Sequence, residues 1–154
     1  MTRPPRAFED LSIGEKRLSA EKMVTKDEII AFAKQYDPQW FHSDVDAARE
    51  SHFGDVIASG IHVLALWRQL DHEINGDIDY VCGIGFDELR LKTALRPGDR
   101  VFVTSEITEL TASKTGKERG TATTFYTMIN QAGDIIVSFT SINLVYTRRA
   151  RPLS

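Results

Sequence analysis

The stretch Ala58–Ile74 reads ASGIHVLALWRQLDHEI, and it predicts the helix around which the rest of the chain is organised. Its first two turns are apolar on nearly every side, which is typical of an enclosed helix rather than a surface helix. Its second half keeps only Leu70 and Ile74 apolar, so we expect that end to emerge into solvent and to stop near Asn75-Gly76.

The first residues of this helix carry the features of a binding site. Ser59 is a plausible N-cap, because a serine hydroxyl accepts a hydrogen bond from the first free N–H groups of a helix. Gly60 has no side chain, so the backbone there can approach another group closely, although a close-packing glycine is the alternative interpretation. A helix that starts at a buried site presents unpaired N–H donors to it.

Length and composition narrow the class of protein. A chain of 154 residues with 42% hydrophobic content predicts one domain over residues 1–154 with a real core. The polar, proline-containing N-terminus and the lack of an apolar run of about 20 residues predict a cytoplasmic protein with no membrane span. A net charge of -3 argues against a nucleic-acid surface, and a single cysteine, Cys82, provides neither a disulfide framework nor a thiolate metal site.

The segment before the central helix predicts a second, shorter helix. We expect a loose arm over residues 1–10 and a short strand that ends near Val24. Thr25 and Glu28 then form a capping box. The apolar side chains of Ile29, Phe32, Ala33 and Tyr36 follow at helical spacing and would share one face of a helix. Pro38 ends this helix, since proline disfavours helical geometry at the residue before it.

Beyond the central helix the pattern changes to strands. Alternation at Ile84 and Phe86 shifts by one place at Leu89 and Leu91, which predicts a bulge near residues 87–88. Further strands are expected over residues 101–107, 121–130 and 135–146, with a turn at 96–99 and a hairpin at 131–134. Helices followed by an antiparallel meander indicate an α+β domain.

The candidate chemistry lies in the loop Asp37-Pro38-Gln39-Trp40-Phe41-His42. It places a carboxylate and an imidazole five positions apart beside two large aromatic residues, and loops on a rigid scaffold often carry catalytic groups. The spacing alone is weak evidence, because Asp-Pro is also an ordinary turn. His62, similarly, has the alternative interpretation of a core histidine.

Together these segments resemble the MaoC-like dehydratases, relatives of the (R)-specific enoyl-CoA hydratases. The resemblance rests on the capping-box helix from Thr25, on Asp37 and His42, on Phe53-Gly54, on residues 57–62 (IASGIH) and on the Arg96-Pro97-Gly98-Asp99 turn. It covers nearly the whole chain and implies a hotdog fold, in which an antiparallel sheet wraps a long central helix.

The family resemblance also implies an activity and roles for residues. Asp37 and His42 would activate the water that adds to C3 of a trans-2-enoyl-CoA, and the Gly60 backbone N–H would stabilise the thioester oxyanion. Trp40, Phe41, Ser59 and His62 are the expected substrate-binding residues. The resemblance implies no cofactor beyond the coenzyme A of the substrate, no metal, and pairing of two chains into a homodimer.

The sequence departs from the family at three places. Characterised hydratases read Asp-x-Asn-Pro-x-His in the loop, whereas Gln39 and Trp40 occupy the Asn and Pro positions here. Their central helix begins His-Gly rather than Ser59-Gly60, and Arg68 stands where they often carry a serine. Two alternatives therefore stay open, an acyl-CoA thioesterase of the same fold and a non-catalytic acyl-CoA binding subunit. Arg148, Arg149 and Arg151 are either contacts for coenzyme A phosphates or a solvated basic tail.

Overall fold

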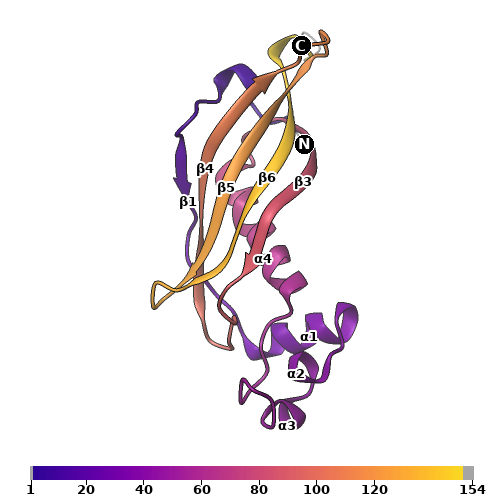
Figure 1. Cartoon of the computed structure of the whole chain (residues 1–154), viewed down its shortest axis with the longest axis vertical. Coiled ribbons are helices and arrows are strands. Elements are labelled where there is room, and N and C mark those ends of the chain that lie inside the picture. The colour runs from indigo at the N-terminus through magenta and orange to yellow at the C-terminus, as the bar shows by residue number, and fades with distance from the viewer. Residues whose placement is uncertain (1, 151–154) are drawn as a thin grey trace.

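The computed structural model describes residues 2–150, and in it a long antiparallel sheet curves around one helix, α4 (Figure 1). The sheet order is β1-β4-β5-β6-β3, and β2 pairs with β4 beside β1. Three short helices, α1, α2 and α3, gather beyond one end of the sheet (Figure 1). The elements are η1 (Phe8–Asp10), β1 (Lys16–Leu18), β2 (Lys22–Met23), α1 (Lys26–Tyr36), α2 (Trp40–Ser43), α3 (Val45–Ala48), α4 (Gly60–Asn75), β3 (Tyr80–Leu91), β4 (Arg100–Ala112), β5 (Arg119–Asn130), β6 (Ile135–Tyr146) and η2 (Arg148–Ala150).

The strands follow the predicted pattern. β6 has the predicted bounds, and β4 and β5 extend the predicted ranges. The bulge in β3 is confirmed, because the pairing with β6 shifts between Asp87 and Arg90 and Glu88 adopts a φ of 53°. The single strand expected before Val24 is instead two short strands, β1 and β2, which both pair with β4.

Helix α1 is built by the predicted capping box. The Thr25 hydroxyl accepts a hydrogen bond from the Glu28 N–H at 3.2 Å, and the Glu28 carboxylate accepts one from the Thr25 N–H at 3.1 Å. The helix ends at Tyr36, and Asp37 is its C-cap, as the following proline requires. The predicted loop 37–42 is partly helical, because α2 begins at Trp40 and carries His42.

Helix α4 is not enclosed in the single chain. Its buried stripe packs on the sheet, where the Trp67 ring meets the rings of Tyr126 and Phe139 edge to face at 5.0 and 4.7 Å. Ile61, in the apolar first turn, is 59% exposed. The prediction of burial on all sides was wrong for this half, because the sheet of one chain covers only one side of the helix.

The polar end of α4 meets the expectation on one side only, where Arg68, Gln69, His72 and Glu73 are exposed. Asp71 and Asn75 are 1% and 5% exposed, although their polarity predicted that this end would emerge into solvent. The Asp71 carboxylate accepts hydrogen bonds from the Tyr126 hydroxyl at 2.6 Å and from the Asn75 amide at 2.9 Å. Buried polar groups are tolerated when they are paired, so this end packs on the sheet as well.

The N-terminal arm is ordered from Thr2 onward, contrary to the predicted loose segment. The Arg6 backbone donates to Asp77 and accepts from Asp79, at 3.0 and 2.8 Å, and the Arg6 side chain pairs with Glu15 at 2.5 Å. Ala7 is fully buried. Backbone pairing with the segment after α4 fixes the arm, and a pattern search along the chain does not reveal such a long-range contact.

Candidate active site

His42 is held in one orientation by the backbone. Its ring is 5% exposed, and Nδ1 lies 2.7 Å from the carbonyl oxygen of Ile57. A carbonyl oxygen can only accept, so Nδ1 carries the hydrogen and Nε2 of the neutral ring is left as an acceptor. Nε2 lies 3.6 Å from Oδ2 of Asp37.

Asp37 sits at the C-terminal end of α1 and receives two side-chain donors. The Ser59 hydroxyl donates to Oδ2 at 2.6 Å, and the Gln39 amide donates to Oδ1 at 3.0 Å. These hydrogen bonds, first that of Ser59 and then that of Gln39, hold the pKa of the Asp37 carboxyl below its ordinary value. A helix C-terminus disfavours a nearby carboxylate, and these two donors to the charged form act in the opposite direction.

Ser59 and Gly60 begin α4 at the same place. Ser59 is fully buried and is the predicted N-cap, since its hydroxyl accepts a hydrogen bond from the Ile61 N–H at 3.2 Å. Gly60 is the first residue of the helix, where backbone N–H groups have no intrahelical partner. A Cβ atom at residue 60 would lie 2.6 Å from Cδ1 of Leu91, so the backbone approaches the end of β3 closely.

A cavity of about 350 Å³ adjoins these groups. Both His42 and Gly60 line it, whereas Asp37 is outside the lining and reaches the site through its oxygen 3.6 Å from Nε2 of His42. Its wall is otherwise mostly apolar, with Lys92 as its cationic member, and consists of Phe53, Ile57, Ala58, Val63 and residues 91–95. The cavity therefore combines an imidazole acceptor, a helix N-terminus and an apolar wall.

The structure does not bring every predicted binding residue to this cavity. Trp40 is 50% exposed, and Phe41 packs against His42 with ring centroids 4.4 Å apart, so that it supports the imidazole without lining the cavity. Ser59 is covered completely, and its hydroxyl faces Asp37. Contacts of these three residues with a substrate stay predictions.

His62 lies on another side of α4, between that helix and α1. Its ring stacks on Phe32 with centroids 4.5 Å apart and is outside the lining of the cavity. Burial lowers the pKa of His62, and its Nδ1 has no hydrogen-bond partner among residues 2–150. This placement favours the alternative of a core histidine, and a substrate contact stays a prediction.

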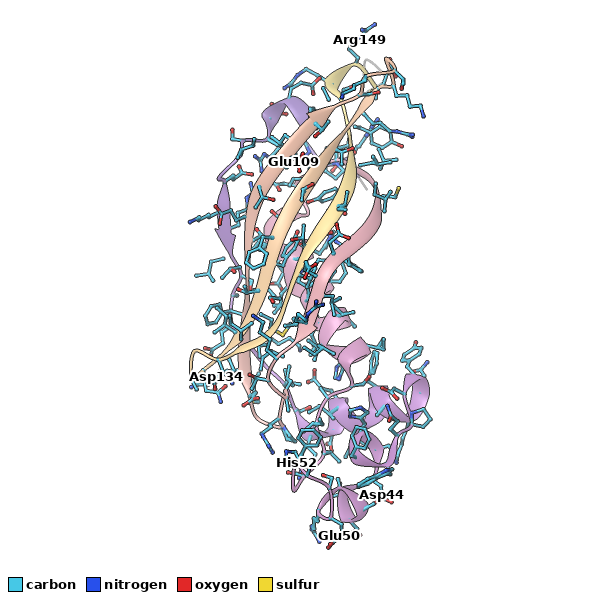
Figure 2. All side chains as sticks on the ribbon, viewed as in Figure 1. Asp44, Glu50, His52, Glu109, Asp134 and Arg149 are labelled. Atoms are coloured by element: carbon cyan, nitrogen blue, oxygen red, sulfur yellow. The ribbon has the colours of Figure 1, made fainter. Side chains whose placement is uncertain are left out.

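The basic side chains singled out in the sequence also lie elsewhere. Arg68 pairs with Asp71 at 2.8 Å and stacks over Trp67, away from the cavity lining. Figure 2 shows Arg149 at the opposite end of the molecule from His52, which adjoins the cavity residue Phe53. Arg151 lies outside the described residues.

Several parts of the site were not identified from the sequence. Gln39 was noted as a departure from the family, and its position two residues after Asp37 was the available signal for a hydrogen bond. The carbonyl of Ile57 and the wall at residues 91–95 carry no such signal, because backbone position and tertiary contact create them. Within the described range 2–150, no three His, Cys, Asp or Glu side chains gather closely enough to hold a metal ion.

Comparison with known proteins identifies the family. The family model "MaoC like domain" matches residues 9–132, and the chain belongs to this family. It is 29% identical to the uncharacterised protein YdeM of Bacillus subtilis over 80% of this chain and 87% of that protein. It is 30% identical to 3-hydroxyacyl-thioester dehydratase Z of Mycobacterium tuberculosis over 66% of this chain and 69% of that protein.

Solved structures agree with the fold. A MaoC-like dehydratase from Rhodospirillum rubrum is 34% identical and superposes with a TM-score of 0.86, covering 96% of this chain and 99% of that one. A conserved hypothetical protein of Mycobacterium tuberculosis with a double hotdog fold is 14% identical, with a TM-score of 0.78 over 98% of this chain and 47% of that one. The fold is the predicted hotdog fold. No described helix is long and apolar enough to cross a membrane.

Proposed function

We propose that this protein hydrates a trans-2-enoyl-CoA to the (R)-3-hydroxyacyl-CoA, or catalyses the reverse dehydration. The observation that carries the proposal is the pair of acceptors, Nε2 of His42 and Oδ2 of Asp37, 3.6 Å apart beside an apolar cavity that Gly60 also lines. Dehydration of a 3-hydroxyacyl thioester is the activity named for one relative, and hydration is its reverse.

In this mechanism a water molecule donates one hydrogen to each of these two acceptors. Water is a poor nucleophile, so a base must take its proton as the oxygen attacks C3. The Nε2 atom of His42 is the base in this proposal, because two donors already weaken the basicity of Asp37, and the carboxylate orients the water and stabilises the resulting imidazolium. The His42 imidazolium then gives this proton to C2 of the enolate, which restores the neutral imidazole and completes the addition of water. Positioned acid–base groups of this kind contribute roughly 10²- to 10⁴-fold in rate.

The N-terminus of α4 would receive the charge that develops on the substrate. As oxygen adds to C3, the electron pair of the double bond moves toward the thioester oxygen and gives an enolate. The N–H of Gly60, at the positive end of the helix dipole, would donate to that oxygen. One preorganised donor of this kind commonly lowers the barrier by about 3 kcal/mol.

The acyl thioester would lie partly against a second copy of the chain. β3 is an edge of the sheet and, with Ile61 of α4, exposes large apolar side chains: Ile84 is 57% exposed, Phe86 49% and Leu91 54%. Exposed apolar edges of this kind mark interaction surfaces. Leu91 also lines the cavity, so a homodimer formed over this surface would bring the partner close to the bound acyl group.

The test follows the absorbance of the conjugated enoyl thioester with a panel of trans-2-enoyl-CoAs. Asp37→Asn and His42→Gln should each reduce hydration by orders of magnitude while the circular dichroism spectrum is kept. Asp46→Asn is the matched control, because this carboxylate is 89% exposed and should leave the rate unchanged.

Parallel measurements separate the alternatives. Release of free thiol would indicate a thioesterase, in which water attacks the carbonyl carbon instead of C3. Thermal stabilisation by acyl-CoA without turnover of any substrate would indicate a binding subunit. A fully active Asp37→Asn variant would remove Asp37 from the mechanism.

A further inference from the structure

The Ser59 hydroxyl joins two parts of the site that are far apart in sequence. It donates to Oδ2 of Asp37 at 2.6 Å and accepts from the N–H of Ile61 at 3.2 Å, so both its hydrogen and a lone pair are used. The side chain is fully buried, and it lies between the end of α1 and the beginning of α4. Capping needs only the lone pair, and the donated hydrogen bond is therefore additional to the cap.

The bond falls on the carboxylate oxygen that faces the imidazole. Oδ2 of Asp37 is the atom 3.6 Å from Nε2 of His42, whereas Gln39 holds the other oxygen, Oδ1. With one oxygen bonded to each donor, the plane of the carboxylate is fixed, and Oδ2 keeps a lone pair on the side of His42. A carboxylate free to rotate would not hold water at one distance from the imidazole.

The same hydroxyl fixes the carboxylate relative to the helix N-terminus. The Ser59 hydroxyl accepts a hydrogen bond from the N–H of Ile61, and Gly60 lies between these two residues. The cap therefore also fixes the position of the Gly60 N–H. The Ser59 side chain thus fixes the Asp37 carboxylate, which would orient the water, relative to the Gly60 N–H, which would bind the thioester oxygen. Misplacement of such groups by about 1 Å can cost on the order of 100-fold in rate.

We propose that Ser59 is a positioning residue, which orients the Asp37 carboxylate toward His42 while it aligns the Gly60 N–H. This role rests on the proposed hydration, and it differs from a substrate contact because the hydroxyl faces Asp37 and is covered completely. The titratable side chain that faces Asp37 is His42 of α2. Within the described residues, α1 and β3 bring no ion pair to Asp37, and α4 brings the Ser59 hydroxyl.

The first measurement needs no substrate. The ¹³C carboxyl resonance of Asp37, assigned by its loss in Asp37→Asn, is titrated in the wild type, in Ser59→Ala and in Ser59→Cys. We expect the Asp37 pKa to rise in Ser59→Ala, because the donor that most stabilises the charged form is gone. Ser59→Cys keeps a side chain of similar shape with a weaker donor and should give an intermediate value. An Asp37 titration that is unchanged in both variants would overturn the proposal.

The second measurement uses the hydration assay. Ser59→Ala should lower kcat by roughly 10- to 100-fold with KM nearly unchanged. Thr25→Ala is the matched control, because it also removes an N-cap hydroxyl from a helix but lies beside Glu28 instead of the site. It should lower the Tm and leave kcat, KM and the Asp37 titration as they are.

The outcomes distinguish this proposal from the proposed function. A rise in KM with kcat and the Asp37 titration unchanged would make Ser59 a substrate contact and overturn the positioning role. If the wild type hydrates no enoyl-CoA, the proposed function fails, and the carboxyl titration still decides whether Ser59 controls Asp37.

Discussion

Tyr126 and Asp71 form a buried contact whose removal has a calculable cost. The Tyr126 hydroxyl donates to the carboxylate of Asp71 at 2.6 Å, and both residues are 1% exposed. Tyr126→Phe keeps the ring that packs on Trp67 and Phe139 and removes only the hydroxyl. Asp71 would retain hydrogen bonds from Asn75 and Arg68, at 2.9 and 2.8 Å.

The expected loss is mainly that of one hydrogen bond to a buried charge, since the hydrogen bond that the hydroxyl accepts from the Asn75 amide is long, at 3.4 Å. Such bonds contribute about 1.5–3 kcal/mol to the free energy of unfolding, because the remaining carboxylate is desolvated without its partner. For a chain of 154 residues this corresponds to a decrease in Tm of about 3–12 °C. The measurement is urea unfolding together with calorimetry at one protein concentration, since association shifts apparent stability.

Tyr36→Phe provides the control for this substitution. Tyr36 is 63% exposed, so loss of its hydroxyl should change the free energy of unfolding by less than about 0.5 kcal/mol. The reasoning is refuted if Tyr126→Phe is as mild as Tyr36→Phe, because the hydroxyl would then not stabilise the buried carboxylate.

Three further predictions concern the packing and the surface of α4 and β3. Burial lowers the pKa of His62, so below about pH 6.5 the unfolded chain binds more protons than the folded chain and the stability of the wild type should fall. His62→Phe should remove that part of the pH dependence of stability. Identical curves of stability against pH for the two proteins would contradict this prediction. Leu66→Ala, at a position that is 4% exposed, should cost about 2–5 kcal/mol, while the half-buried Leu64→Ala should cost less; equal losses in urea unfolding would mean that α4 has no exposed side. Ile84→Lys should shift the protein toward monomer in light scattering after size-exclusion chromatography, and an unchanged dimer would place the interface elsewhere.

Local chemistry made part of this structure predictable from the sequence. The capping box at Thr25 and the proline after Asp37 determine both ends of α1, because each acts on backbone groups within a few residues. The alternation in β3 located its bulge for the same reason. The family motif located Asp37 and His42, and the structure brings their side chains together.

Burial was the part that periodicity predicted poorly. Composition predicted that the apolar half of α4 is enclosed and the polar half solvated, whereas the sheet covers one side of both halves. Asp71 is inside because Tyr126, 55 positions further along the chain, supplies a donor there. Polarity alone does not distinguish a solvated carboxylate from one that is buried and paired.

The sequence by itself determined α1, α4, the strands β3 to β6 and their order, and the family motif within it located the candidate acid and imidazole. Only the tertiary structure decided how those groups are tuned. The pKa of Asp37 lies below its ordinary value because Ser59, 22 positions away, donates to the same oxygen that faces His42. Secondary structure follows from interactions between near neighbours, whereas the pKa and orientation of a side chain depend on which distant groups the fold places within hydrogen-bonding distance.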